Sequence, residues 1–96
     1  MYNVFFSDDA LLDIQESFIW YEEQKKGLGD EFLDCIYKST EKILNNPYLY
    51  QLQYRELRIK IVPRFPYRIF FMIQEHEIII HAVLRMSRNT STLKNK

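Results

Sequence analysis

Cysteine and histidine are scarce in this chain of 96 residues, which has one cysteine, Cys35, and two histidines, His76 and His81. A single cysteine cannot form a disulfide within the chain, and the absence of disulfides is typical of proteins from a reducing compartment. One thiol and two distant histidines also lack the spacing of a zinc site. We therefore expect no metal and no cofactor, and we interpret Cys35 as a small buried hydrophobe on a helix.

Glycine and proline are also few, with two and three residues respectively, and no long apolar run is present. This composition, with 16% aromatic residues, favours a packed core over disorder. The N-terminal stretch MYNVFFSDDALLDIQ has no basic region, and acidic residues interrupt it before a signal core or a membrane span could form. The sequence therefore predicts one cytoplasmic domain over residues 1–96 with no membrane association, and residues 89–96 are expected to be a frayed tail.

Arginine is missing from the first half of the chain, although the formal net charge of the whole chain is zero. Residues 1–54 contain four lysines and ten acidic residues, whereas residues 55–96 contain six arginines, three lysines and three acidic residues. Local potential rather than net charge governs attraction to a phosphate or to an acidic partner. The second half is therefore where we expect a basic functional surface.

Two helices are predicted in the first half. Ser7 is a suitable N-cap for a helix over residues 8–26, and Gly27 suits the left-handed position after its end. A second helix is predicted from Leu28 to the Asn-Asn-Pro sequence at 45–47. We expect the acidic residues of both helices to lie on a solvated outer face. The apolar residues expected to point inward are Ala10, Leu11, Ile14, Phe18 and Tyr21 in the first helix and Leu28, Phe32, Ile36 and Ile43 in the second.

Four strands are predicted around these helices. A short apolar strand over residues 2–6 precedes them, and three segments after them, 56–62, 67–74 and 78–86, are joined by short connections that favour an antiparallel meander. Residues 48–54 are interpreted as a connecting loop, and an extra turn of helix is left open as the alternative. The predicted fold class is α+β, with an N-terminal strand and a two-helix antiparallel hairpin packed on one face of an antiparallel sheet of three to four strands.

Side-chain alternation along the last three strands predicts which residues the helices leave uncovered. Leu57, Ile59 and Ile61 are expected to face the helices, so their neighbours should point to the open side. The sequence therefore predicts a basic surface with an apolar floor on the open face of the sheet. Its charged residues and its histidine are expected to be Arg58, Lys60, Arg68, His81 and Arg85.

Several motifs, taken in order along the chain, resemble the RelE/ParE toxin superfamily. They are DIQESFIWYEEQKKGLGDEFL, then NP, LR, RFPYRIFF and IIIHAVLRMSRN, and together they cover nearly the whole chain. The tyrosine and acidic pair before Gly-Leu-Gly, and FPYRI before an apolar strand that ends in AVL and a basic residue, resemble the ParE-like branch. The resemblance implies the same order of strand, two helices and antiparallel strands. It also implies the toxin of a bacterial type II toxin–antitoxin pair, held inactive by a small antitoxin protein.

The resemblance leaves two mechanisms open. Members similar to ParE inhibit DNA gyrase, whereas members similar to RelE cut messenger RNA in the ribosomal A site, using basic strand residues and an acid or base near the C-terminus. The resemblance assigns phosphate or target binding to four cationic residues, which are Arg58, Lys60, Arg68 and Arg88. Arg85, placed on the open face by alternation, completes the predicted basic face.

The C-terminal group that would move protons is missing. RNA-cutting members usually carry a tyrosine or histidine near the end, and NTSTLKNK has neither. Arginines stabilise developing charge but stay protonated, so they are poor acids and bases. His81 has a suitable intrinsic pKa to fill this role, although a strand histidine that only packs and donates one hydrogen bond is the preferred alternative. If the chain is an RNase, its catalytic residues are expected to be Arg68, His81 and Arg88.

The sequence therefore favours a ParE-like toxin without enzymatic activity. Its expected partners are a cognate antitoxin and DNA gyrase, and a homodimer is left open. A ribosome-dependent RNase, with RNA and the ribosome as partners, is the first alternative. An inactive orphan that retains only the fold is the second.

Overall fold

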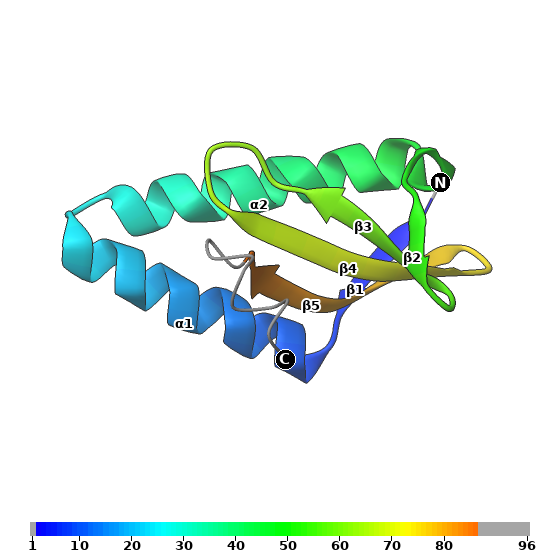
Figure 1. Cartoon of the computed structure of the whole chain (residues 1–96), viewed down its shortest axis with the longest axis horizontal. Coiled ribbons are helices and arrows are strands. Elements are labelled where there is room, and N and C mark those ends of the chain that lie inside the picture. The colour runs from blue at the N-terminus through cyan, green and yellow to red at the C-terminus, as the bar shows by residue number, and fades with distance from the viewer. Residues whose placement is uncertain (1, 87–96) are drawn as a thin grey trace, which may run out of the picture.

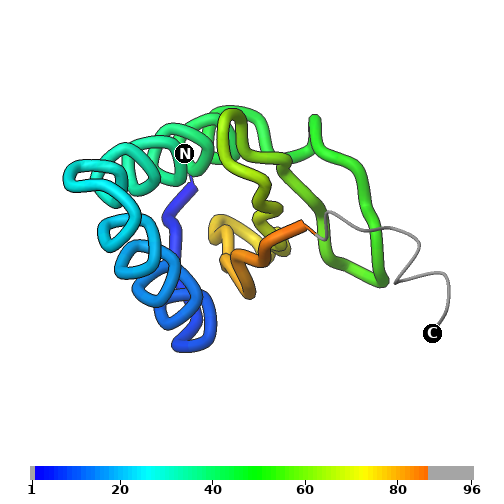
Figure 2. The backbone as a smooth tube through the Cα atoms, turned by 60° about the vertical axis from the view of Figure 1, so that its left-hand side comes forward, coloured from blue at the N-terminus to red at the C-terminus, as the bar shows by residue number. Residues whose placement is uncertain are grey.

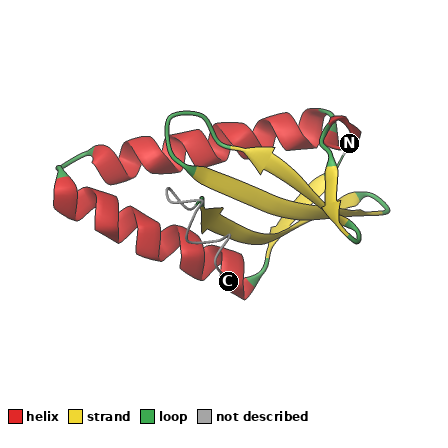
Figure 3. Cartoon of the chain, in the orientation of Figure 1, coloured by secondary structure: helices red, strands yellow, loops and turns green. Residues whose placement is uncertain are grey.

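The computed structural model describes residues 2–86, so Arg88 and the predicted tail lie outside the described residues. Two long helices form an antiparallel hairpin beside a five-stranded sheet (Figure 1; helices red and strands yellow in Figure 3). The elements are β1 (Asn3–Phe6), α1 (Asp8–Gln24), α2 (Leu28–Asn45), the short 3-10 helix η1 (Pro47–Leu49), β2 (Leu52–Tyr54), β3 (Leu57–Ile61), β4 (Tyr67–Gln74) and β5 (Glu77–Arg85). The predicted α+β class and helix hairpin are confirmed.

The sheet has five strands in the order β1-β5-β4-β3-β2, rather than the three to four predicted. β1 pairs in parallel with β5 at one edge, and the other neighbours are antiparallel. The prediction of a loop over residues 48–54 was wrong, because η1 and β2 form there. All three residues of β2 are exposed, so burial imposes no alternation from which this edge strand could be predicted.

Both helices pack on the same face of the sheet, and Figure 2 shows them together on one side of the strands. Aromatic rings pack between the helices and the sheet. The ring centroids of Tyr21 in α1 and Phe32 in α2 lie 5.3 Å apart, and those of Phe32 and Tyr67 in β4 lie 4.9 Å apart. Four strand residues, Ile69, Phe71, Ile78 and Ile80, are fully buried beneath the helices. Leu11, predicted to point inward, is 52% exposed, so that prediction was wrong.

The helix connection is fastened by an acidic residue that was expected in solvent. The Glu22 carboxylate accepts hydrogen bonds from the backbone N–H groups of Gly27, at 2.9 Å, and Gly29, at 3.0 Å. A carboxylate at a helix N-terminus satisfies unpaired N–H groups and complements the helix dipole. Glu22 therefore fixes the start of α2 relative to the end of α1. Within residues 2–86, neither helix has a segment long and apolar enough to cross a membrane.

Candidate functional site

The register between β3 and β4 decides which cationic side chains share a face. Arg58 lies opposite Phe71 and Lys60 lies opposite Ile69, and both partners are buried beneath the helices. Residues directly opposite each other in an antiparallel pair point to the same side of the sheet. Arg58 and Lys60 therefore belong to the helix-covered side, and the prediction that they share the open face with Arg68 was wrong.

A β-bulge in β5 also places Arg85 on the helix-covered side of the sheet. The register between β4 and β5 shifts after Phe70, so that His81 has no partner residue and Arg85 lies opposite the buried Tyr67. The Arg85 guanidinium lies over the Trp20 ring of α1, 5.5 Å from its centroid. Burial raises the pKa of Tyr21, and the positive charge of the nearby Arg85 opposes this increase. The predicted open-face position of Arg85 was therefore wrong.

Two side chains at the start of α1 hold this bulge. The Ser7 hydroxyl donates to the backbone carbonyl of His81 at 2.9 Å and also accepts from the N–H of Ala10 as the N-cap. The Asp13 carboxylate accepts from the backbone N–H of Val83 at 3.0 Å. The unpaired backbone groups of the bulge thus find partners on the helix. Asp13 was expected on a solvated face, and no sequence pattern in β5 reveals its role.

Replacing Asp13 with alanine is expected to destabilise the fold by about 1–3 kcal/mol, because the N–H of the buried Val83 loses its acceptor. Urea denaturation measures the change, and Glu16→Ala, which removes an exposed acid from the same helix, is the control, with an expected effect of about 0.5 kcal/mol or less. Amide exchange at Val83 should also accelerate in Asp13→Ala. Equal unfolding midpoints for the two variants would contradict this role.

The open face of the sheet is mostly apolar and carries Arg68 near one end. Arg68 is exposed and lies between its partners Ile61 and Leu84, which are 59% and 48% exposed. Within residues 2–86 no carboxylate lies within ion-pair distance of Arg68. A hollow of about 190 Å³ beside it is lined by Gln51, Gln53, Ile59, Ile61 and Arg68. The register places further apolar side chains on this face, and they are Phe5, Phe70, Met72, Ile79 and Ala82.

His81 is exposed on the same face but away from Arg68. It precedes Leu84, the partner of Arg68, by three positions, which is about 10 Å along a strand. It lines a separate hollow of about 270 Å³ together with Tyr54, Arg55, Glu56, Leu57 and Met72. Arg68 and His81 therefore do not line one pocket. Arg88, the third expected catalytic residue, lies outside the described part of the chain.

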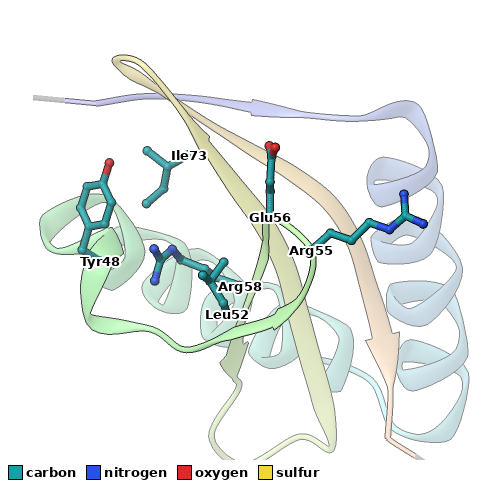
Figure 4. A pocket seen from close by; sticks show the side chains of 6 residues that line it. All are labelled: Tyr48, Leu52, Arg55, Glu56, Arg58 and Ile73. Carbon is teal, nitrogen blue, oxygen red and sulfur yellow. The ribbon is translucent and has the colours of Figure 1, made fainter.

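Arg58 is held by two tyrosines from the segment before β2, and Figure 4 shows its side chain directed toward Tyr48. Its Nη1 donates to the backbone carbonyl of Tyr50 at 2.6 Å, and its guanidinium lies 5.1 Å from the centroid of the Tyr48 ring. The Lys60 ammonium lies 5.5 Å from the centroid of the Tyr50 ring. Burial lowers the pKa of Lys60, and the nearby positive charge of Lys42 lowers it further. These two cations are therefore occupied, at least in part, by contacts within the chain.

Arg64, which lies in the connection between β3 and β4, also has a partner within the chain. Its guanidinium forms an ion pair with the Glu31 carboxylate of α2, with an N–O distance of 2.6 Å. The pair links the connection to the N-terminal turn of α2. Among the described residues, Arg58, Lys60, Arg64 and Arg85 thus make contacts within the chain, whereas Arg68 on the open face forms no ion pair.

Comparison with known proteins identifies the family. Residues 4–90 match the family model for the ParE toxin of the type II toxin–antitoxin system parDE. This chain belongs to the ParE toxin family. No curated protein matches the sequence.

Solved structures of toxins share the fold of this ParE-family chain at low sequence identity. A chromosomal ParDE system from P. aeruginosa matches with a TM-score of 0.81 and 14% identity, covering 91% of this chain and 98% of the other. The intact RelBE toxin–antitoxin complex of E. coli matches with a TM-score of 0.69 and 15% identity, covering 92% and 100%. The isolated E. coli RelE toxin matches with a TM-score of 0.70 and 14% identity, covering 99% and 98%. The likeness to both ParDE and RelE structures supports the fold and does not distinguish between their mechanisms.

Proposed function

We propose that this ParE-family chain is neutralised by a cognate antitoxin that binds the open face of the sheet. We also propose that the free toxin acts in the cytoplasm by binding a protein target such as DNA gyrase. The observation that carries the proposal is the apolar open face around Arg68, which no helix of residues 2–86 covers.

The composition of this face indicates the kind of partner. Large exposed apolar patches on small proteins mark interaction sites, and Ile61 and Leu84 would bury apolar area on both sides of Arg68. Arg68 would then meet a carboxylate of the partner, because a desolvated arginine without a counter-charge is costly. An amphipathic antitoxin segment with an acidic residue among apolar ones satisfies both requirements.

The arrangement of the cationic residues favours target binding over RNA cleavage. Cleavage by a 2′-hydroxyl needs a proton acceptor, a proton donor and charge stabilisation around one phosphate. Arg68 and His81 line different hollows, and Arg58 and Arg85 contact tyrosine and tryptophan side chains on the helix-covered side. Arg68 and His81, the expected catalytic residues, therefore do not surround one point, and the hollow at His81 contains Arg55 and Glu56 instead.

Induced expression followed by an assay of plasmid supercoiling tests the target. Loss of negative supercoiling as growth stops is the expected result, and normal supercoiling in growth-arrested cells would contradict gyrase as the target. The second candidate, a ribosome-dependent RNase, is favoured by the exposure of both Arg68 and His81 on one face. Primer extension would then show cuts within translated codons. Harmless expression of folded protein would leave only an inactive family member.

Arg68→Ala is expected to weaken antitoxin binding by about 1–3 kcal/mol with little change in folding, because Arg68 is exposed and would lose one charge-assisted hydrogen bond. Titration calorimetry with the purified antitoxin measures this loss. Arg64→Ala is the matched control, since Arg64 already pairs with Glu31 within the chain and an exposed ion pair adds little to stability. Unchanged affinity in Arg68→Ala would remove Arg68 from the interface.

A further inference from the structure

A second cationic site lies on the other side of the sheet, between α2 and β3. A hollow of about 130 Å³ opens there, and its lining residues are Cys35, Lys38, Ser39, Lys42, Lys60 and Pro63. Its volume is sufficient for several water molecules, since one buried water needs roughly 10–15 Å³ of such space. A small anion of tetrahedral shape therefore fits.

Ser39 brings a polar group to this hollow without a partner. The residue is 2% exposed, and its hydroxyl forms no hydrogen bond with any group of residues 2–86. The next residue, Thr40, shows the usual arrangement for a hydroxyl within a helix, because it donates to the backbone carbonyl of Ile36 at 2.9 Å. Buried side-chain hydroxyls in folded proteins are nearly always paired. The unpaired Ser39 is therefore a donor that a bound ligand could use.

Lys42 and Lys60 both line this hollow without an acidic partner. Within residues 2–86, neither Lys42 nor Lys60 forms an ion pair, whereas Lys38 at the rim pairs with Asp34 at 3.1 Å. Burial and the charge of Lys42 both disfavour the charged form of Lys60. The Tyr50 ring compensates this only in part, since a ring face attracts a cation more weakly than an anion does. An anion between the two lysines would remove the repulsion.

We propose that this hollow binds a phosphate group, either inorganic phosphate or the terminal phosphate of a monoester. Two ammonium groups and a hydroxyl supply donors for separate oxygens of one tetrahedral anion, and a dianion gains most from two cations. A hollow of about 130 Å³ has room for one phosphate group, so a terminal phosphate suits it better than a chain that must enter and leave. The site is independent of the open face and does not rest on the proposed function.

Titration of the isotope-labelled full-length chain with inorganic phosphate, followed by amide NMR, tests the proposal. Saturable changes in amide chemical shift are expected for residues of β3 and of the C-terminal half of α2. Lys42→Gln and Lys60→Gln should each weaken binding by roughly ten- to a hundredfold, the loss for one hydrogen bond to a charged group. Lys26→Gln, which changes an exposed lysine in the connection between α1 and α2, should leave the affinity unchanged. A parallel titration with adenosine 5′-monophosphate distinguishes the sources: tighter binding than phosphate identifies a nucleotide, and equal or weaker binding identifies the free anion.

The Ser39→Ala variant and the alkylation rate of Cys35 provide two further measurements, which phosphate should not affect if these residues have only a structural role. Ser39→Ala removes an unpaired hydroxyl, so the variant should be as stable as the parent chain in phosphate-free buffer and should gain less thermal stability when phosphate is added. Cys35, the only cysteine, lines the hollow, and phosphate should slow its alkylation by neutral iodoacetamide. Non-saturable shifts, equal affinity in the lysine variants and the Lys26→Gln control, or unchanged alkylation at saturating phosphate would each overturn the proposal.

Discussion

Replacing both Ile61 and Leu84 with threonine is expected to weaken antitoxin binding by about a hundredfold, which corresponds to roughly 3 kcal/mol. These residues flank Arg68 on the open face and are about half exposed, so they contribute little to the core. In a complex they would bury most of their apolar area, at about 25 cal/mol per Å². Threonine keeps a branched Cβ and a high strand propensity, so the sheet should fold as before. Titration of each purified variant with the antitoxin gives the affinity, and denaturation with urea gives the stability.

The control for this experiment is a pair of apolar residues on another surface. Leu12 and Ile19 of α1 are 51% and 47% exposed, close to the values for the open-face pair. Leu12→Gln combined with Ile19→Gln removes a similar apolar area from the outer side of the helix hairpin. We expect this control to bind the antitoxin like the parent chain. The opposite pattern, with normal binding by the threonine variant and weak binding by the glutamine variant, would place the antitoxin on α1.

Element positions could be predicted from sequence where burial imposes a pattern. β4 was predicted at 67–74 and occupies Tyr67–Gln74, because apolar residues on both faces mark a central strand. Both helices were predicted within about two residues of their ends, because capping and Gly27 mark the boundaries. β2 was missed because an exposed edge strand of three residues carries no such pattern.

The faces of the strands could not be predicted as well as their positions. Alternation in β3 separates Ile59 and Ile61 from Arg58 and Lys60, but it does not say which set faces the helices. The assumption that isoleucines face the core was wrong, because the pairing with β4 sends Lys60 to the covered side and Ile61 to the open side. Lysine and arginine tolerate this position because their long stems pack while their charged ends lie over the rings of Tyr50 and Tyr48. An apolar open face is what a site for a protein partner requires.

The bulge in β5 also depends on residues that are distant in the sequence. Nothing in the sequence IIIHAVLR signals an unpaired residue at His81, and a strict alternation placed Arg85 on the wrong face. The position of the bulge is fixed by Ser7 and Asp13, which lie more than 65 residues earlier in the sequence. Their side chains form hydrogen bonds with the backbone of His81 and Val83. Such contacts depend on how α1 lies against β5, and single-strand periodicity contains no information on this packing.

The two glycines of the helix connection are expected to respond very differently to alanine. A Cβ on Gly29 would lie 2.8 Å from two atoms of the Phe18 ring and 2.8 Å from the Phe18 backbone oxygen. The ring could turn, but the backbone oxygen is fixed in α1, so the two helices would have to separate where Glu22 holds them together. We expect Gly29→Ala to lower the free energy of unfolding by roughly 2–3 kcal/mol, after the small gain from the better helix propensity of alanine.

Gly27→Ala is the matched control because it changes the same residue type two positions away. Gly27 has a φ of 90° and no heavy atom within 4 Å of an added Cβ, so its substitution costs only the backbone strain of about 1 kcal/mol. In a domain of this size the Gly29 variant should melt about 10–20 °C lower than the parent chain and the Gly27 variant about 4–8 °C lower. A Gly29 variant that melts at or above the Gly27 variant would mean that the helices of this hairpin do not pack as closely at Phe18 as the structure places them.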